Sequence, residues 1–477
     1  MRWPNFAGGS VAARSLLAAD EISVNVWPCS LSSPTAKAPK ALYGAPGSTL
    51  YADLLAGPVR ALLAEAGRCF AVAGDGFFEL LAPALFVRRG SVALDTAPAS
   101  LIPNVTGGLE LLILSGGRGY TFDLQTNVFA AITDADFQPN AVMGGFLDGY
   151  GIYLASSGTF YLSSLNDFTA WDAADAGTRS QASDRVRALL VDPTKLWIFG
   201  EYTSEPWYDT GASDFPFAPV PEAFLDVGIA ARHSVALVGG TPCWFGQTRG
   251  GGRAVYMAPS EAQATVISDA IAPELERYTT VSDAYGWEEV WDGHPMYLLT
   301  FPTHQRTWAF DLKEQQIHQR GLWVNGDWQA WRTRCHCVWN GVHLAGSRTD
   351  GRVFEQSLET YTDAGDDLRW VRQPARIWDE NQRLFHRAIE LHTEPGLGQL
   401  PPGVVDPTVD LQWSNDGGRT WANVVTASLG RQGEYQARVQ WHRLGSARDR
   451  VYRFSGTSPV KRAFLDASLE VIRGVAA

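Results

Sequence analysis

A short hairpin pattern recurs along most of the chain and constrains the fold more than any other feature. Each unit has an apolar or alternating run, a glycine-rich turn and a second run, which is the pattern of a β-hairpin. Seven such units begin at Arg68, Leu109, Gly149, Lys195, His233, His294 and Val338. Their spacing is about 40 residues, apart from one wider interval after His233, and this period is typical of a four-stranded propeller blade. The sequence therefore predicts an all-β fold built on a β-propeller.

The number of blades and the domain boundaries follow from the same repeat. Six blades are favoured and seven are allowed, because the N-terminal arm or the last hairpin could complete a blade shared between the chain's ends. The wider interval, residues 261–292, includes a short helical pattern over Ser268–Arg277. We expect an extended arm over residues 1–60, a β-propeller over 61–366, and a C-terminal β-sandwich-like module over 367–477 that could also close the propeller.

The arm and the aromatic residues of the repeat have structural interpretations. Prolines interrupt the arm at short intervals, but one alternating run, Ile22–Trp27, could add a strand to another element. Aromatic side chains in the repeat are expected to pack between blades, because aromatic residues dominate sheet cores. These side chains are Trp197, Phe199, Trp244, Phe245, Tyr297 and Trp308.

The C-terminal module contains the most specific short motif of the chain, an Asp-box of the form S-x-D-x-G-x-T-W. Its residues are Ser414, Asp416, Gly418, Thr420 and Trp421. In such a turn the Ser and Asp side chains bond backbone amides, glycine supplies a positive φ, and the Trp packs beneath the hairpin. The motif carries no nucleophile, so we interpret it as a structural turn. Asp-boxes also occur in sialidases, which leaves a glycan-cleaving enzyme as the alternative interpretation.

Charge and cysteine content exclude several classes of protein. The formal net charge is -12, and no cluster of Lys and Arg has the size expected of a groove that tracks phosphates. Five scattered cysteines argue against a disulfide framework, and no apolar run is long enough for a signal peptide or a membrane span. We expect synthesis in a cytoplasm, and neither tight DNA binding nor membrane insertion.

No constellation of residues selects a catalytic, cofactor or metal site. The chain has no G-x-S-x-G motif, no phosphate-binding loop, and no spacing that singles out a pair of carboxylates. His and Cys gather once, at Cys335, His336, Cys337 and His343. On a strand the two thiols share one face and His336 the other, so they cannot converge on one ion. We therefore expect no enzyme activity, no cofactor and no metal.

Four segments along the chain carry a family resemblance through their order. An arm segment, Asp20–Pro28, is followed by the turn Gly44–Gly47 and then by Gly57–Arg60, and the middle blades include Ile267 and a short helix. The fourth segment is a W-x-R-L-G-x-A-R-D-R-V cassette beside the Asp-box. Its residues include Trp441, Arg443, Leu444, Gly445, Arg448 and Asp449. This order resembles the tail nozzle or tail-hub proteins of short-tailed bacteriophages, also called packaged-DNA stabilisation proteins or tail accessory factors.

The resemblance implies a structural virion protein that assembles as a homohexameric ring below the portal and the adaptor. Such a ring retains packaged DNA and provides the channel for its ejection. The implied partners are the adaptor (the head-to-tail connector), a tail needle or plug, tail fibres or spikes, and phage DNA passing through the lumen without sequence-specific binding. Six copies at -12 each would carry about -72, which suits a conduit that must not hold its DNA tightly. The alternative is a propeller-type carbohydrate-active enzyme or receptor-binding tail protein, which would need several Asp-boxes.

Overall fold

The computed structural model describes residues 2–474 except 4, 16, 32, 34, 180–181, 213 and 397–405. Nearly all of its regular structure is β-strand, which confirms the predicted all-β class. The helices in this part of the chain are the 3-10 helix η1 (Asp269–Ile271) and α1 (Ala272–Glu276), which confirm the short helix expected in the wider interval.

Four blades are antiparallel sheets of four consecutive strands. The first contains β6 (Val59–Glu65), β7 (Arg68–Ala73), β8 (Gly76–Ala82) and β9 (Leu85–Ser91). The second contains β10 (Ser100–Asn104), β11 (Glu110–Ser115), β12 (Arg118–Asp123) and β13 (Phe129–Ala131). The third contains β14 (Ala141–Leu147), β15 (Tyr150–Ala155), β16 (Phe160–Ser164) and β17 (Asp167–Gly177). The fourth contains β18 (Val186–Val191), β19 (Leu196–Gly200), β20 (Ser204–Asp209) and β21 (Phe217–Pro219).

The last three blades are less regular. The fifth contains β22 (Gly228–Ile229), β23 (Ala236–Val238), β24 (Thr241–Gln247), β25 (Arg253–Ser260) and β26 (Gln263–Val266), and the two short strands β22 and β23 both pair with β24. The sixth contains β27 (Tyr285–Trp291), β28 (His294–Phe301), β29 (Arg306–Asp311) and β30 (Gln316–Arg320), followed by the hairpin β31 (Leu322–Val324) and β32 (Asp327–Gln329). The seventh contains β33 (Thr333–Trp339), β34 (Val342–Ser347) and β35 (Arg352–Ser357). The fourth strand of this blade is the N-terminal β5 (Gly47–Asp53), and β36 (Thr362–Asp363) and β37 (Asp366–Asp367) lie beside β5.

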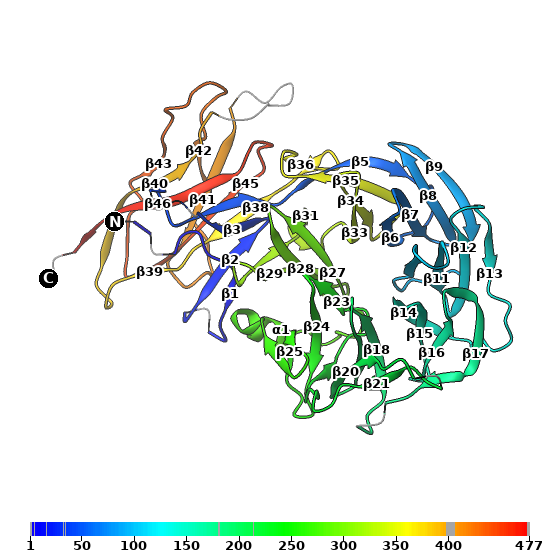
Figure 1. Ribbon diagram of the computed structural model, residues 1–477. Helices are drawn as coiled ribbons and strands as arrows, with labels where there is room; N and C mark the ends of the chain where they lie inside the picture. Colours follow the sequence, from blue (N-terminus) through cyan, green and yellow to red (C-terminus); the bar gives the residue numbers. More distant parts are fainter. Residues whose placement is uncertain are drawn as a thin grey trace.

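The seven blades follow one another round a closed ring (Figure 1). Neighbouring blades contact one another in chain order, mostly through their inner strands, and β33 contacts β6 to close the ring. The structure has seven blades, so the favoured number of six was wrong and the allowed number of seven is correct. The N-terminal segment does close a blade, as expected, because β5 is the fourth strand of the seventh blade. Each of the seven predicted hairpins therefore lies in a separate blade.

Successive side chains of a blade strand point to opposite faces of the sheet, and those of the inner and middle strands fill the cores between neighbouring blades. On β7, Phe70 and Val72 pack against the second blade, while Cys69 and Ala71 pack against the seventh. Because both faces of the strand are covered, its sequence is a continuous apolar run. The six aromatic side chains expected between blades are all buried, which confirms that interpretation: they are Trp197, Phe199, Trp244, Phe245, Tyr297 and Trp308.

A β-sandwich lies beside the propeller, and both ends of the chain lie on its side (Figure 1). One of its sheets contains β3 (Val26–Ser30), β4 (Lys40–Gly44), β40 (Leu384–Thr393), β43 (Val439–His442), β44 (Ser446–Ala447) and β46 (Ala463–Arg473). The other contains β1 (Val11–Ala12), β2 (Asp20–Val24), β38 (Trp370–Gln373), β39 (Ile377–Trp378), β41 (Thr408–Ser414), β42 (Val425–Ser428) and β45 (Asp449–Gly456). The N-terminal segment thus adds strands to both sheets, as the alternation at Ile22–Trp27 predicted. Trp3 and Phe6 lie in the core between them.

Candidate functional site

The most unusual feature of the structure is the joint between propeller and sandwich, where one sheet belongs to both. The outer strand of the sixth blade, β30, pairs in parallel with β2, and β2 pairs antiparallel with β38 of the sandwich. The N–H of Asn25 also donates to the carbonyl of Gln319 at 2.9 Å. An unbroken hydrogen-bonded sheet therefore runs from β27 in the propeller to β42 in the sandwich.

Asn25 separates β2 from β3 and holds both domains with its side chain. It is fully buried, and its φ of 54° lies in the left-handed region, which Asn tolerates better than most residues. Its Nδ2 donates to the carbonyls of Gly321 and Arg369, each at 2.7 Å, and its Oδ1 accepts from the N–H of Gly321 at 3.0 Å. Gly321 follows the sixth blade and Arg369 precedes β38, so one amide group ties the propeller to the sandwich.

Arg372 on β38 fixes the first residues of the chain. Its guanidinium is fully buried and donates to the carbonyls of Phe6 at 2.8 Å and Gly9 at 3.0 Å, and to Ser23 Oγ at 3.0 Å. Burial lowers the pKa of Arg372, and the ion pair with Glu21 at 2.8 Å opposes that effect. Because removing a buried charge from its partners is costly, this residue pins the N-terminal segment to the sandwich.

The small residues near the N-terminus allow that segment to reach the propeller. The N–H of Ser10 donates to the carbonyl of Ile317 at 2.6 Å, and the N–H of Gly9 donates to Gln316 Oε1 at 2.9 Å. A Cβ on Gly9 would lie 2.6 Å from the carbonyl oxygen of Ile317, so this approach requires glycine. The small-residue opening of the sequence therefore lies against β30.

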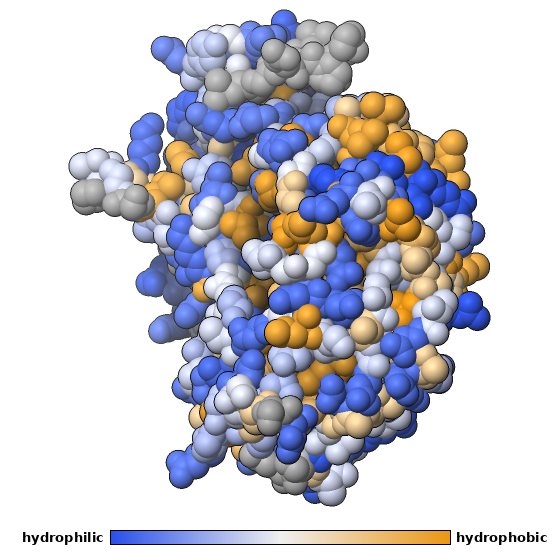
Figure 2. All heavy atoms as spheres, turned by 45° about the vertical axis from the view of Figure 1, so that its right-hand side comes forward, coloured by the Kyte–Doolittle hydropathy of each residue, from blue (hydrophilic) through white to orange (hydrophobic). Residues whose placement is uncertain are grey.

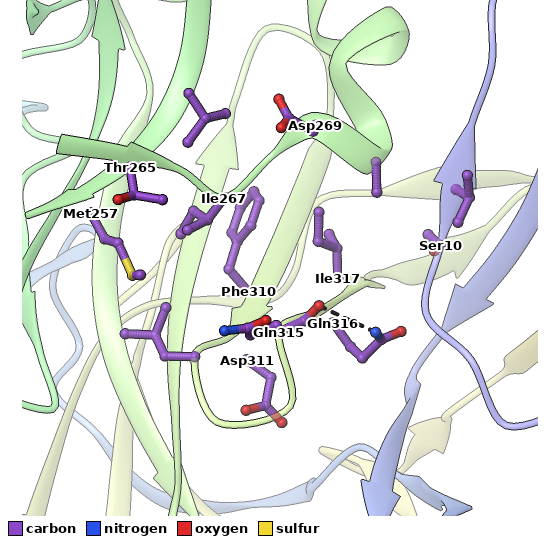
Figure 3. A pocket seen from close by; sticks show the side chains of 14 residues that line it. Ser10, Met257, Thr265, Ile267, Asp269, Phe310, Asp311, Gln315, Gln316 and Ile317 are labelled. Atoms are coloured by element: carbon purple, nitrogen blue, oxygen red, sulfur yellow. Dashed lines mark hydrogen bonds between the residues drawn. The ribbon is translucent and has the colours of Figure 1, made fainter. Parts of the chain in front are cut away.

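A pocket of about 330 Å³ lies where the fifth blade, the sixth blade and the N-terminal segment meet (Figure 3). Met257, Ile267 and Phe310 give it an apolar wall. The carboxylate of Asp311 is already bonded to His294 and to backbone N–H groups of the following turn. The pocket is thus a gap between three packed parts and presents no pair of free carboxylates among its described lining residues.

The Asp-box lies at the turn between β41 and β42. Ser414 Oγ donates to Asp416 Oδ1 at 2.6 Å and accepts from the N–H of Gly418 at 2.8 Å. Asp416 also accepts from the N–H and the hydroxyl of Thr420, at 2.9 and 2.6 Å. The bonds from Ser414 and Thr420 hold the pKa of Asp416 well below its usual range. Gly418 has a φ of 92°, and its carbonyl accepts from Trp421 Nε1 at 3.0 Å.

This turn is linked to the N-terminal segment by a chain of polar contacts. The guanidinium of Arg453 lies 3.7 Å from the ring centroid of Trp421 and donates to Gln373 Oε1 at 3.0 Å. Gln373 Nε2 in turn donates to the carbonyl of Asp20 at 2.7 Å. Burial lowers the pKa of Arg453 to about 10 and raises the pKa of Asp20, and the charge of each residue partly opposes the shift of the other. The Asp-box thus lies over the same joint as Asn25.

The cassette residues lie on and between β43 and β45. Trp441 is buried and donates through Nε1 to the carbonyl of Val425 at 2.8 Å, while the N–H of Arg443 donates to a carbonyl of β40 at 2.9 Å. The carbonyl of Gly445 accepts from the N–H of His386 at 2.8 Å.

Three further cassette residues take different roles. Asp449 forms a 2.6 Å ion pair with Arg376, whereas Arg448 is exposed. Arg450, the second arginine of the R-D-R-V part of the cassette, is buried, and it donates to Asn415 in the Asp-box at 2.8 Å and to the carbonyl of Leu444 at 2.6 Å. Cassette and Asp-box therefore form one bonded unit.

The Cys and His cluster of the seventh blade is arranged as expected for a strand. Cys335 and Cys337 pack with the apolar residues toward the first blade, and Cys337 Sγ lies 3.9 Å from Cys69 Sγ. His336 lies on the other face, with its Nε2 3.0 Å from His343 Nδ1. The thiols and imidazoles do not converge. The sequence analysis gave no role to Asn25 or Arg372. A polar Asn inside the apolar run of the arm is a signal that could have identified Asn25.

Fold and joint together define a protein in which a seven-bladed propeller and a β-sandwich form one unit. A family model described as "Bacteriophage P22 Gp10, beta-propeller" matches residues 9–361, and one described as "Bacteriophage P22 Gp10, beta-sandwich" matches residues 369–472. The chain belongs to this family. It is a structural tail nozzle or hub protein that stabilises packaged DNA in short-tailed phages, and the glycan-cleaving alternative is not favoured.

Comparison with solved structures adds only distant likenesses. The WD40 propeller domain of Doa1 is 14% identical with a TM-score of 0.39, over 65% of this chain and 97% of that one. BamB from Moraxella catarrhalis is 13% identical with a TM-score of 0.36, over 62% and 95%. No match was found among the curated proteins. In the part of the chain that the structure describes, no helix is long and apolar enough to cross a membrane.

Proposed function

We propose that six copies of this chain form a ring below the portal and adaptor, which retains the packaged genome and later conducts it out of the short tail of the virion. The proposal includes contacts with the adaptor, with a needle or plug, and with fibres or spikes. It also includes synthesis in the host cytoplasm and no catalytic role. The Asp-box and the cassette are assigned a structural role within it.

The joint is the observation that carries this proposal. A subunit of a pressurised channel must keep its domains in fixed relative positions. Here the propeller cannot swing away from the sandwich without breaking the bonds of β2 to both neighbours and the three bonds of Asn25. We assign residues 1–60 to an N-terminal arm whose strands before β5 act as this clasp, with 61–366 and 367–477 as the two bodies that it joins.

An exposed apolar cluster is a candidate contact between copies. Leu81 and Leu85 flank the β8–β9 turn, where the N–H of Ala84 donates to the carbonyl of Tyr51, next to Leu50. Leu50, Leu81 and Leu85 are 56%, 43% and 54% exposed. Apolar surface lies among polar residues on the propeller side that Figure 2 brings forward. Clustered apolar side chains on a protein surface mark interaction sites more often than isolated ones do.

The charge of the chain supports passage of DNA without specific binding. A net charge of -12 per copy repels a polyanion, so the ring can surround DNA and still release it.

Reconstitution on heads tests the proposal. Heads that contain DNA, portal and adaptor but lack this protein are mixed with the purified chain, and bound copies are counted by native mass spectrometry or six-fold averaging in electron microscopy. We expect six copies per head, and retained DNA that resists added nuclease. Another stoichiometry, or binding that leaves the DNA exposed, would contradict the proposal.

A pair of leucine variants separates the contact between copies from folding. Leu85→Asp is expected to reduce ring formation, because a charge in an apolar contact is desolvated without a partner. Leu165→Asp is the matched control, since Leu165 is 59% exposed on the third blade, away from the cluster. Equal assembly of both variants would remove the cluster from the interface.

A further inference from the structure

Three potential metal ligands from three different segments meet beside the joint. Cys29 lies on β3 of the N-terminal segment, His294 begins β28 of the sixth blade, and Glu314 lies in the turn between β29 and β30. One ligand atom from each lies within 4.8 Å of the other two. None of these residues takes part in the contacts described for Asn25, Arg372 or the Asp-box.

The spacing of the thiol and the imidazole already fits a metal. Cys29 Sγ lies 3.5 Å from His294 Nε2. In a tetrahedral zinc site with Zn–S near 2.3 Å and Zn–N near 2.0 Å, two such ligands lie about 3.5 Å apart. A carboxylate oxygen of Glu314 lies within 4.8 Å of both ligand atoms, so a change in its side-chain torsions can bring it into the set.

The imidazole of His294 is held in the tautomer that a metal requires. Asp311 Oδ2 lies 2.8 Å from its Nδ1, so the ring donates its N–H there and directs the Nε2 lone pair at Cys29. The ring is 1% exposed, and the indole of Trp27 packs against it with centroids 4.8 Å apart. A carboxylate that orients a ligating imidazole in this way is the usual outer partner of zinc-bound histidine.

Two lysines provide the positive charge now present at the cluster. Lys313 Nζ lies 3.3 Å from His294 Nε2, and Lys40 Nζ lies 3.3 Å from Glu314 Oε2. Glu314 also accepts from the N–H and the hydroxyl of Ser30, at 2.9 and 2.7 Å. The ammonium of Lys313 thus stands where a cation would bind, on a flexible stem that can turn away toward solvent.

We propose that Cys29, His294 and Glu314 form a binding site for a zinc-class divalent cation, with water as the fourth ligand and Lys313 displaced on binding. The mixed thiolate, imidazole and carboxylate set is one that zinc accepts. Binding converts the Cys29 thiol to a metal-bound thiolate and releases its proton to solvent. The bound ion fastens β3 to the sixth blade, independently of the hydrogen bonds around Asn25.

Cobalt titration of the full-length chain tests the site, because a cobalt–thiolate bond gives a charge-transfer absorption band in the near ultraviolet. We expect one ion per chain, a band that excess zinc abolishes, and a higher thermal midpoint with zinc than with chelator. Cys29→Ser removes the band, whereas Cys335→Ser, at another half-buried free thiol, retains it. Asp311→Asn weakens binding by about 10- to 100-fold, as loss of an outer partner does.

Two further variants keep the test decisive if Cys29→Ser fails to fold. Glu314→Gln leaves the thiol and the β3 pairing in place and is expected to weaken zinc binding at least about 10-fold. Lys313→Met is expected to strengthen it, because the competing ammonium is gone. No cobalt band in the wild-type chain, a band unchanged in Cys29→Ser, or zinc affinity unchanged in Glu314→Gln would overturn the site. These results leave the ring proposal untouched, since they concern a single chain.

Discussion

Replacing Asn25 tests whether the joint makes propeller and sandwich one unit. Asn25→Gly relieves the backbone at φ 54° but removes three buried hydrogen bonds. At roughly 1 kcal/mol each, their loss lowers the free energy of unfolding by about 3 kcal/mol. Asn25→Ala loses the same bonds and adds about 1 kcal/mol of left-handed backbone strain. The difference between the two variants therefore separates hydrogen bonding from backbone conformation.

Hydrogen exchange is the direct assay, because the effect is local opening of the joint before global unfolding. The Gly321 N–H, which donates to Asn25 Oδ1, is expected to lose protection by a factor of about 100 in Asn25→Gly, since 3 kcal/mol corresponds to about two decades. Asn340→Gly is the matched control: Asn340 has a φ of 51° but is exposed in a hairpin turn. Protection at Gly321 within a factor of two of wild type in Asn25→Gly would refute the reasoning.

Three further perturbations probe other parts of the structure. Asp416→Ala is expected to lower the thermal midpoint of the sandwich. In the wild type the contribution of Asp416 is present above the ordinary Asp pKa and lost as pH falls below it, because its folded-state pKa is depressed. Burial lowers the pKa of His386 to about 4, so denaturant titrations should show stability falling between pH about 6.5 and about 4, and falling less in His386→Gln. Gly9→Ala should expose the N-terminal segment to limited proteolysis, because its Cβ would meet the Ile317 carbonyl at 2.6 Å, whereas Gly252→Ala, with no neighbour closer than 3.5 Å, should not.

The blades could be predicted from sequence because their determinants are local. Apolar runs such as the one around Phe70 are buried on both faces, and several of the turns, such as those at Gly116–Gly117 and Gly239–Gly240, carry glycine at positive φ, so these hairpins can be recognised from local sequence. The Asp-box was recognisable for the same reason: its bonds run from Ser414 and Asp416 to residues at most four positions away.

The joint could not be predicted because its partners are far apart in the chain. Asn25 meets Arg369, and Arg372 meets Phe6, over more than 300 residues, and the local sequence around each polar residue does not show which distant group it bonds. The sequence favoured six blades over the allowed seven for a related reason. Nothing local in Gly47–Asp53 shows that it pairs with β35 as the fourth strand of an existing hairpin unit.

The pairing of β5 with β35 also sets the order of events during synthesis. Asp53 leaves the ribosome roughly 300 residues before its partner Arg352, a delay of tens of seconds at ordinary rates of translation. Throughout that time the edges of β5 have no strand to bind, and the circle of blades stays open. A chain that stops early therefore cannot close its propeller, so completion of the circle reports that translation has passed the seventh blade.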